Sequence, residues 1–142
     1  MSRKILIYSD GACSGNPGPA GVGVVIKDGE NVLKEISRPI GDATNNIAEY
    51  TALIYALQEA LILHAEDVEV FTDSELLFKQ VKGLYQVKEP GIKRLFDQLK
   101  HLMSGFRHLE IQHIPREKNK DADRLAKQAI KTKKSSAPES EI

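Results

Sequence analysis

The chain has 142 residues, of which 41% are hydrophobic and 28% are charged, so it suits one globular domain with its own core rather than a disordered or fibrous chain. Cys13 is its one cysteine, which excludes an internal disulfide and a cysteine-based zinc site. Twenty basic residues balance twenty acidic ones, so any binding of nucleic acid has to come from local patches rather than from net charge.

The chain opens with an apolar segment that runs into an acid. Ile5, Leu6 and Ile7 predict a short buried strand, and Asp10 follows it. The glycines and prolines of residues 11–19 predict that the strand ends there in a glycine-rich turn, because glycine loosens the backbone and proline lacks a donor. Taken alone, Asp10 is better explained as a turn former than as a catalyst.

Two more strands are predicted next. Residues 22–26 alternate between apolar and small side chains, and residues 28–29, Asp-Gly, are a hairpin signal before a strand at residues 32–36. The first three strands therefore predict an antiparallel meander. Pro39 and Gly41 are expected to end it.

A long amphipathic helix is predicted at residues 47–61, where apolar residues recur at three- and four-residue steps. Thr44, Asn45 or Asn46 can cap its first turn. Glu49 is expected in that first turn, where an isolated glutamate most simply complements the helix dipole.

A second strand that ends in an acid is predicted at residues 68–72, which are rich in β-branched and aromatic side chains. Asp73 follows this strand as Asp10 follows the first, although aspartate is also a favoured helix cap. A helix comes next and ends at Gly83, and Pro90 opens another.

The last predicted elements are a strand at residues 109–114, a charged loop at residues 115–120 and a final helix with Asp123 in its first turn. The residues after this helix lack an apolar face. We therefore predict one domain at residues 1–131 and a disordered tail at residues 132–142.

The element order predicts an α/β domain with a five-stranded mixed sheet, an antiparallel meander plus parallel strands, flanked by helices. Sites in such sheets form beyond the carboxyl ends of the strands, where Asp10 and Asp73 are expected. Glu49 and Asp123 belong to helices that can start near the same rim.

Four clustered carboxylates would repel one another, so a shared site needs a positive charge. A divalent metal ion supplies it, and carboxylate and water oxygens suit Mg²⁺ or Mn²⁺ much better than Zn²⁺. Two such ions about 4 Å apart can activate a water and stabilise the departing oxygen of a phosphodiester.

The order and context of these acids resemble the type 1 ribonuclease H family. Four motifs within about residues 5–130 carry the resemblance, namely SDGACSGNPGPAG, TNNIAEYTAL, FTDSELL and NKDADRLA. The resemblance implies a ribonuclease H-like fold and a metal-dependent endonuclease that hydrolyses the RNA strand of RNA–DNA hybrids. It also implies 5′-phosphate and 3′-hydroxyl ends and two Mg²⁺ ions, with Mn²⁺ as a substitute.

The resemblance assigns roles by position. Asp10, Glu49, Asp73 and Asp123 match the family's metal-binding carboxylates. Asp10 and Asp73 are then expected at both ions, Glu49 at the ion on the leaving-group side, and Asp123 at the ion that positions the attacking water.

Other matched positions belong to substrate binding. Gly11 and Cys13 match positions where the family's backbone approaches the RNA minor groove and its 2′-hydroxyls. Asn16, Thr44 and Asn45 match residues that hold the two strands, with Thr44 and Asn45 on the DNA side. Turn formation and helix capping are alternative roles for these side chains.

The chain departs from well-studied bacterial members before the last acid, where those members carry a mobile loop rich in glycine and histidine. His113 falls at the position of the family's proton-transfer histidine but lacks the neighbouring glycines. It is either that helper or a strand residue on the face of Leu109 and Ile111. Arg116 can approach the scissile phosphate instead, or be a solvated loop arginine.

The chain also resembles a short form of the family without the basic protrusion, because the segment at residues 82–96 is short and contains no tryptophan. Its basic residues, Lys82, Lys88, Lys93 and Arg94, are either a reduced version of that protrusion or, more simply, a solvated helix face. We therefore expect weaker and more salt-sensitive binding of hybrid. Residues 113–134 carry eight Lys or Arg against three Asp or Glu and are the best phosphate-facing patch in the sequence.

Two other functions compete with this one. A hybrid-binding module without turnover is disfavoured because all four acids are intact, and a different metal nuclease, such as a resolvase or transposase, would not be expected to share the SGNPGPAG turn. No segment is long and apolar enough to span a membrane, and Met1 to Lys4 lead into the first strand without a signal-peptide core. We therefore expect a cytoplasmic monomer with no membrane partner.

Overall fold

The computed structural model describes residues 4–136, with side chains described up to Lys131. Among these residues the chain forms five strands, four α-helices and one short 3₁₀ helix. The elements in chain order are β1 (Lys4–Cys13), β2 (Gly18–Asp28), β3 (Asn31–Ala43), α1 (Asn45–Ile62), β4 (Asp67–Thr72), α2 (Glu75–Val81), α3 (Pro90–Met103), β5 (His108–His113), η1 (Arg116–Lys118) and α4 (Lys120–Ser136).

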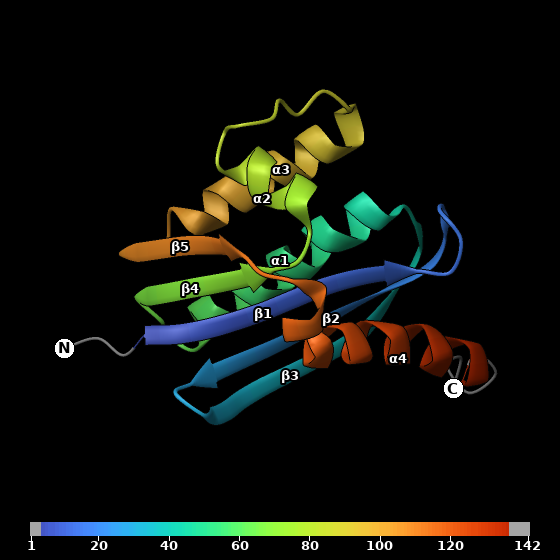
Figure 1. Cartoon of the computed structure of the whole chain (residues 1–142), viewed down its shortest axis with the longest axis horizontal. Helices are drawn as coiled ribbons and strands as arrows, with labels where there is room; N and C mark the ends of the chain where they lie inside the picture. The colour runs from blue at the N-terminus through green and yellow to red at the C-terminus, as the bar shows by residue number, and fades with distance from the viewer. Residues whose placement is uncertain (1–3, 137–142) are drawn as a thin grey trace.

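The strands form one sheet in the order β3-β2-β1-β4-β5. β1 pairs antiparallel with β2, and β2 with β3, whereas β4 lies parallel to both β1 and β5. This confirms the predicted five-stranded mixed sheet. Figure 1 shows α1 behind the sheet and α4 in front of β2 and β3, so helices cover both faces.

The main core lies between the sheet and α1. Alternate residues of β1 and β4, such as Ile5 and Val70, are buried against α1, which contributes Leu53 and Leu57. Burying a side chain of this size stabilises the fold by roughly 1.5–3 kcal/mol. The apolar faces that the sequence predicted for the strands and for the helix therefore pack together in one cluster.

The first strand ends within the glycine-rich segment, as predicted, but the expectation that it ends at Asp10 is wrong. β1 continues through Asp10 and Gly11 to Cys13, and Gly11 pairs with Val22 of β2. What ends near Asp10 is the parallel pairing with β4, whose last partners are Ser9 and Thr72. Asp10 is thus the first residue of β1 beyond the parallel neighbour, at the rim where sites form in such sheets.

The prediction that Pro39 and Gly41 end the third strand is also wrong, since β3 runs through both. β3 is an edge strand, so a proline that lacks an N–H group removes no essential ladder bond. The pairing with β2 shifts register opposite Gly21, where Pro39 is its partner and Gly41 pairs with Ala20. A bulge therefore absorbs the irregularity.

α4 continues to Ser136, so the domain boundary predicted at residue 131 lies inside this helix. Residues 132–136 thus belong to the helix, where we expected a disordered tail. The rest of the predicted tail, residues 137–142, lies outside the described residues. In the described part of the chain, every helix is too short or too polar to cross a membrane.

Candidate metal centre

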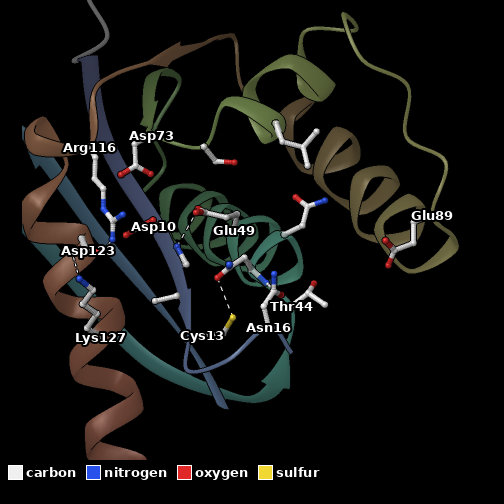
Figure 2. Close-up of a pocket in the computed structure, with 16 residues that line it drawn as sticks. Asp10, Cys13, Asn16, Thr44, Glu49, Asp73, Glu89, Arg116, Asp123 and Lys127 are labelled. Carbon is white, nitrogen blue, oxygen red and sulfur yellow. Dashed lines mark hydrogen bonds and ion pairs between the residues drawn. The ribbon is translucent and has the colours of Figure 1, made fainter. Parts of the chain in front are cut away.

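Three carboxylates meet at the rim of the sheet. Asp10 lies in β1, Glu49 in α1 and Asp73 directly after β4, and one carboxylate oxygen from each lies within 4.8 Å of the others. Asp10 is 5% exposed. Figure 2 shows the three side chains turned toward one another, as the sequence predicted for a shared site.

Glu49 reaches this site because Gly11 lets α1 approach β1. A Cβ atom at Gly11 would overlap the backbone of Ala48, and the Gly11 N–H donates to Glu49 Oε1 over 3.1 Å. The expectation that Glu49 lies in the first helical turn is wrong, because α1 begins at Asn45 and Glu49 is its fifth residue. The alternative that Glu49 only complements the helix dipole loses its basis.

Asp73 is not the residue that caps α2. That role belongs to Ser74, whose Oγ accepts from the N–H of Leu77 over 3.2 Å. The carboxylate of Asp73 instead accepts a hydrogen bond from the side chain of Asn119. Asn119 thus helps to fix the position of the Asp73 carboxylate.

Asp123 lies in the first turn of α4, as predicted, and it faces positive charge. Its Oδ2 is 3.1 Å from Lys127 Nζ, and its Oδ1 is 3.9 Å from Arg116 Nη2. It also shares a hydrogen bond with Asp10. Figure 2 shows Asp123 between Arg116 and Lys127, beside the group of three carboxylates.

The position of Asp123 depends on two glycines that the sequence analysis did not single out. At Gly23 a Cβ atom would overlap the carbonyl of Ala122 and lie 2.9 Å from Leu125 Cβ, and at Gly21 it would lie 2.5 Å from Ala126 O. α4 therefore packs directly on the backbone of β2. A glycine at alternate positions of an apolar strand is the sequence signal for such close packing.

The carboxylates of this cluster are hard to ionise together. Burial raises the pKa of Asp10, Glu49 and Asp73, and the neighbouring carboxylates raise the pKa values of Asp10 and Glu49 further. At Asp123, partial burial is outweighed by the hydrogen bond with Asp10 and by Lys127, so its pKa is lowered. At Asp73 the charge of Arg116 lowers the pKa but does not outweigh burial, so the protein's own cations do not neutralise the group of three.

These donors fit a divalent ion such as Mg²⁺ or Mn²⁺. All are carboxylate oxygens, the ligands that such ions prefer, and their convergence within 4.8 Å matches the separation of atoms that share one ion. An ion of charge +2 would also stabilise the ionised forms that burial and repulsion disfavour.

The cluster forms one end of a cleft of about 840 Å³. The predicted substrate-binding residues line the same cleft, namely Gly11, Cys13, Asn16, Thr44 and Asn45. Asn46, Leu76 and Glu89 also line it, and the sequence analysis had not proposed them as site residues. The structure therefore brings the predicted acids and the predicted binding residues together.

The residues of the binding half are tied to one another. Asn16 Oδ1 accepts from the N–H of Asn45 over 3.0 Å, and the Cys13 thiol lies 3.0 Å from Asn45 Oδ1. Thr44 caps α1, with its Oγ1 accepting from the N–H of Ile47 over 3.2 Å. Residues 14–17, which connect β1 to β2, are therefore fixed against the start of α1.

The two candidate helpers lie in different places. Arg116 lines the cleft, and its charge lowers the pKa of Asp73 against the larger effect of burial. His113 is the exposed last residue of β5, where its ring stacks on Phe78 with centroids 5.8 Å apart. His113 is not among the described residues that line the cleft.

Asn119 and Lys127 are further site residues that the sequence analysis missed. Asn119 is 1% exposed and donates from Nδ2 to Ser9 O over 2.9 Å, which ties the loop before α4 to β1. This contact joins residues far apart in the chain, so no local pattern announces it. Lys127 follows Asp123 by one helical turn, a spacing that the sequence does display.

Known proteins match the chain along most of its length. A family model described as reverse transcriptase-like matches residues 8–129. A ribonuclease H of Geotalea uraniireducens is 37% identical over 149 residues, which cover 95% of this chain and 99% of that protein. The chain spans only 35% of the length of the bifunctional protein Rv2228c of Mycobacterium tuberculosis, to which it is 43% identical over 129 residues.

Solved structures agree with these relatives. The chain superimposes on RNase H1 of Halobacterium salinarum with a TM-score of 0.88 and 41% identity, over 90% of this chain and 98% of that one. It superimposes on LC11-RNase H1 from compost, solved in complex with an RNA/DNA hybrid, with a TM-score of 0.86 and 47% identity, over 90% and 97% of the two chains. Sequence and fold thus agree, and the chain belongs to the type 1 ribonuclease H family.

Proposed function

We propose that this chain is a metal-dependent endonuclease that hydrolyses the RNA strand of RNA–DNA hybrids. The observation that carries the proposal is the convergence of Asp10, Glu49 and Asp73 in a cleft that also holds the predicted strand-binding residues. The hybrid bound in the structure of LC11-RNase H1, which is 47% identical, supports the same class of substrate.

The proposed reaction uses two Mg²⁺ ions, for which Mn²⁺ can substitute. When bound, the ions supply Lewis-acid chemistry that activates a water and stabilises the departing oxygen, which gives 5′-phosphate and 3′-hydroxyl ends. Asp10 and Asp73 would hold both ions, Glu49 the ion on the leaving-group side, and Asp123 the ion that positions the water. The protein's contribution is to hold these carboxylates in fixed positions. Asp10 lies in β1, Glu49 in α1, and Asp73 directly after β4.

Discrimination between RNA and DNA is proposed for the segment that follows Asp10. The backbone at Gly11 and Cys13 lines the cleft and would approach the minor groove of the hybrid, where the 2′-hydroxyls of RNA lie. A 2′-hydroxyl both donates and accepts hydrogen bonds, and the DNA strand has none to offer. A DNA duplex would therefore lack the contacts that this segment makes.

Thr44, Asn45 and Asn16 are proposed to hold the strands, and their structural roles leave this possible. The Thr44 hydroxyl accepts a hydrogen bond from the backbone of α1, so its own hydrogen can still be donated to a phosphate oxygen. The side-chain Oδ1 of Asn45 is close to the Cys13 thiol, which leaves its amide NH₂ to act as a donor.

Arg116 is proposed to supply positive charge near the scissile phosphate, since it lines the cleft and is 73% exposed at its side chain. A helper role for His113 is weaker, because its ring packs on Phe78. Separate Arg116→Ala and His113→Ala variants, compared at saturating metal, would identify the helper as the one whose loss lowers kcat.

All residues of the proposed site come from one chain, so a monomer is sufficient for the proposed activity. A cytoplasmic location, with no membrane partner, remains our prediction from the sequence.

The test uses matched duplexes of one sequence: an RNA–DNA hybrid, a DNA duplex and an RNA duplex. We expect cleavage of the RNA strand of the hybrid alone, with Mg²⁺ or Mn²⁺ present, and products that a ligase or kinase assay identifies as 5′-phosphate and 3′-hydroxyl ends. Absence of any cleavage across a range of metals would falsify the proposal and favour a binding module without turnover.

A further inference from the structure

Asp123 differs from the other three carboxylates in its electrostatic surroundings. Lys127 Nζ and Arg116 Nη2 approach it to 3.1 and 3.9 Å, and its pKa is lowered. Among the described residues, no lysine or arginine forms an ion pair with Asp10, Glu49 or Asp73, and the pKa of each is raised. Asp123 is thus already paired with cations, whereas the other three form no ion pair within the described part of the chain, and at Asp73 the charge of Arg116 does not outweigh burial.

This difference divides the proposed ion sites. The three carboxylates whose oxygens lie within 4.8 Å of one another present a place for one ion without displacing any cation. The other ion position requires the oxygens of Asp123. The ammonium group of Lys127 lies 3.1 Å from Oδ2 of Asp123, so it occupies a position beside the carboxylate that a metal ion would otherwise take.

We propose that Lys127 competes with the second metal ion for Asp123. When the hybrid binds, the ammonium group of Lys127 leaves Asp123 and pairs with a backbone phosphate, which frees Asp123 for the ion. This inference rests on the proposed function, since it assigns a role in that same site. Binding of the second ion is then coupled to binding of the substrate, while the first ion binds the free protein.

The side chain of Lys127 has the properties that such an exchange requires. It lines the cleft and is 56% exposed, so its ammonium group can leave Asp123 without unpacking the helix. Its flexible four-carbon stem and three donors suit a group that moves between a carboxylate and a phosphate. An exposed ion pair of this kind contributes little to folding, so little stability is lost when it opens.

A second ion pair on α4 provides a matched control. Arg124 Nη2 lies 3.9 Å from Asp121 Oδ1, three residues earlier on the helix, and neither residue lines the cleft. The Arg124→Gln variant therefore removes one positive charge and one intrahelical pair without touching Asp123. Lys127→Arg keeps the charge next to Asp123, whereas Lys127→Gln removes it.

The experiment is a calorimetric titration of Mn²⁺ into the full chain without nucleic acid. For Lys127→Gln we expect the second ion to bind roughly five- to tenfold more tightly than in the wild type, because a unit charge a few ångströms from a divalent ion is removed. The first ion should bind unchanged. Lys127→Arg and Arg124→Gln should match the wild type, and an unchanged second site in Lys127→Gln, or an equal gain in Arg124→Gln, would overturn the proposal.

Binding of hybrid gives an independent reading. Lys127→Gln should raise KM and reduce the slope of log affinity against log salt by about one, because one phosphate contact is lost. A lysine that merely stabilises its helix would change neither quantity, and that result would contradict the exchange. Failure of the wild type to cut hybrid would refute the proposed function, whereas the Mn²⁺ titration would still decide the role of Lys127.

Discussion

Replacing Gly23 by alanine should disable the site by displacing α4, the helix that carries Asp123. A Cβ atom at this position would overlap Ala122 O and would lie 2.5 Å from Ala126 N and 2.9 Å from Leu125 Cβ. Two of these atoms belong to the backbone of α4, which cannot rotate away as a side chain can. The helix therefore has to move off β2, and Asp123 moves with it.

The size of both effects follows from the contacts. Carbon and oxygen normally pack at about 3.4 Å or more, so α4 must shift by roughly 1 Å, and overpacking of this kind costs about 1–3 kcal/mol of folding free energy. A displacement of about 1 Å at a catalytic group can lower the rate by about a hundredfold. The loss of activity should therefore exceed what the loss of folded protein explains.

The assay pairs urea unfolding with kcat/KM on a hybrid at saturating Mg²⁺. Gly91→Ala in α3 is the control, because the nearest atom that its Cβ would meet among the described residues is Glu89 Oε1 at 3.9 Å. That variant should keep its activity and be as stable as the wild type or slightly more so. A Gly23→Ala protein with wild-type stability and wild-type activity would refute the packing argument.

Three other substitutions or conditions give separate tests. Because the pKa values of Asp10 and Glu49 are raised, the folded protein binds more protons than the unfolded chain. In the metal-free protein these two groups therefore contribute fully to stability below their unfolded-state pKa values, and this contribution is lost as pH rises through about 8 for Glu49 and about 10 for Asp10. Urea melts of the wild type and of a double variant, Asp10→Asn with Glu49→Gln, should differ in this way, and Mg²⁺ should remove the loss at high pH. Asp10→Asn should abolish cleavage yet raise the Tm of the metal-free protein by roughly 3 °C, since about 1 kcal/mol of repulsion is relieved, and a lower Tm would contradict this. Thr44→Ala should lose about 1 kcal/mol of stability with the cap of α1, whereas Thr44→Ser should retain it in the same melts.

The sequence predicted those features that local patterns encode. The apolar periodicities identified the strands and the helices, and the four acids were recognised from short motifs in which strand or helix signals stand next to a carboxylate. Asp123 in particular lies in the first turn of its helix, as expected. These features depend on residues close together in the chain, which is why they could be read without the structure.

The errors arose where distant segments decide the outcome. Gly11 reads locally as a strand breaker, but β2 pairs with it and α1 needs its missing side chain. Pro39 reads as a stop, yet it is tolerated because β3 lies at the edge of the sheet. Neither partner can be seen in the local sequence.

Two contributions to the site share this origin. Asn119 acts through Ser9, which lies 110 residues away in the chain, and Gly23 acts through a helix that begins almost a hundred residues later. Lys127 is different, because its spacing from Asp123 is visible in the sequence. Only the structure indicates that this pair faces the cleft rather than open solvent.

The central claim is that metal held by the carboxylate cluster carries out cleavage, and Asp73→Asn tests it most directly. This variant replaces one carboxylate oxygen with an amide NH₂ group, which removes the negative charge, and it leaves Ser74, the cap of α2, in place. Cleavage of a labelled hybrid should be measured against Mg²⁺ concentration, together with hybrid binding. We predict that Asp73→Asn binds hybrid with near wild-type affinity and does not cut it at any Mg²⁺ concentration. Metal-independent cleavage by the wild type, or wild-type turnover by Asp73→Asn, would contradict the account.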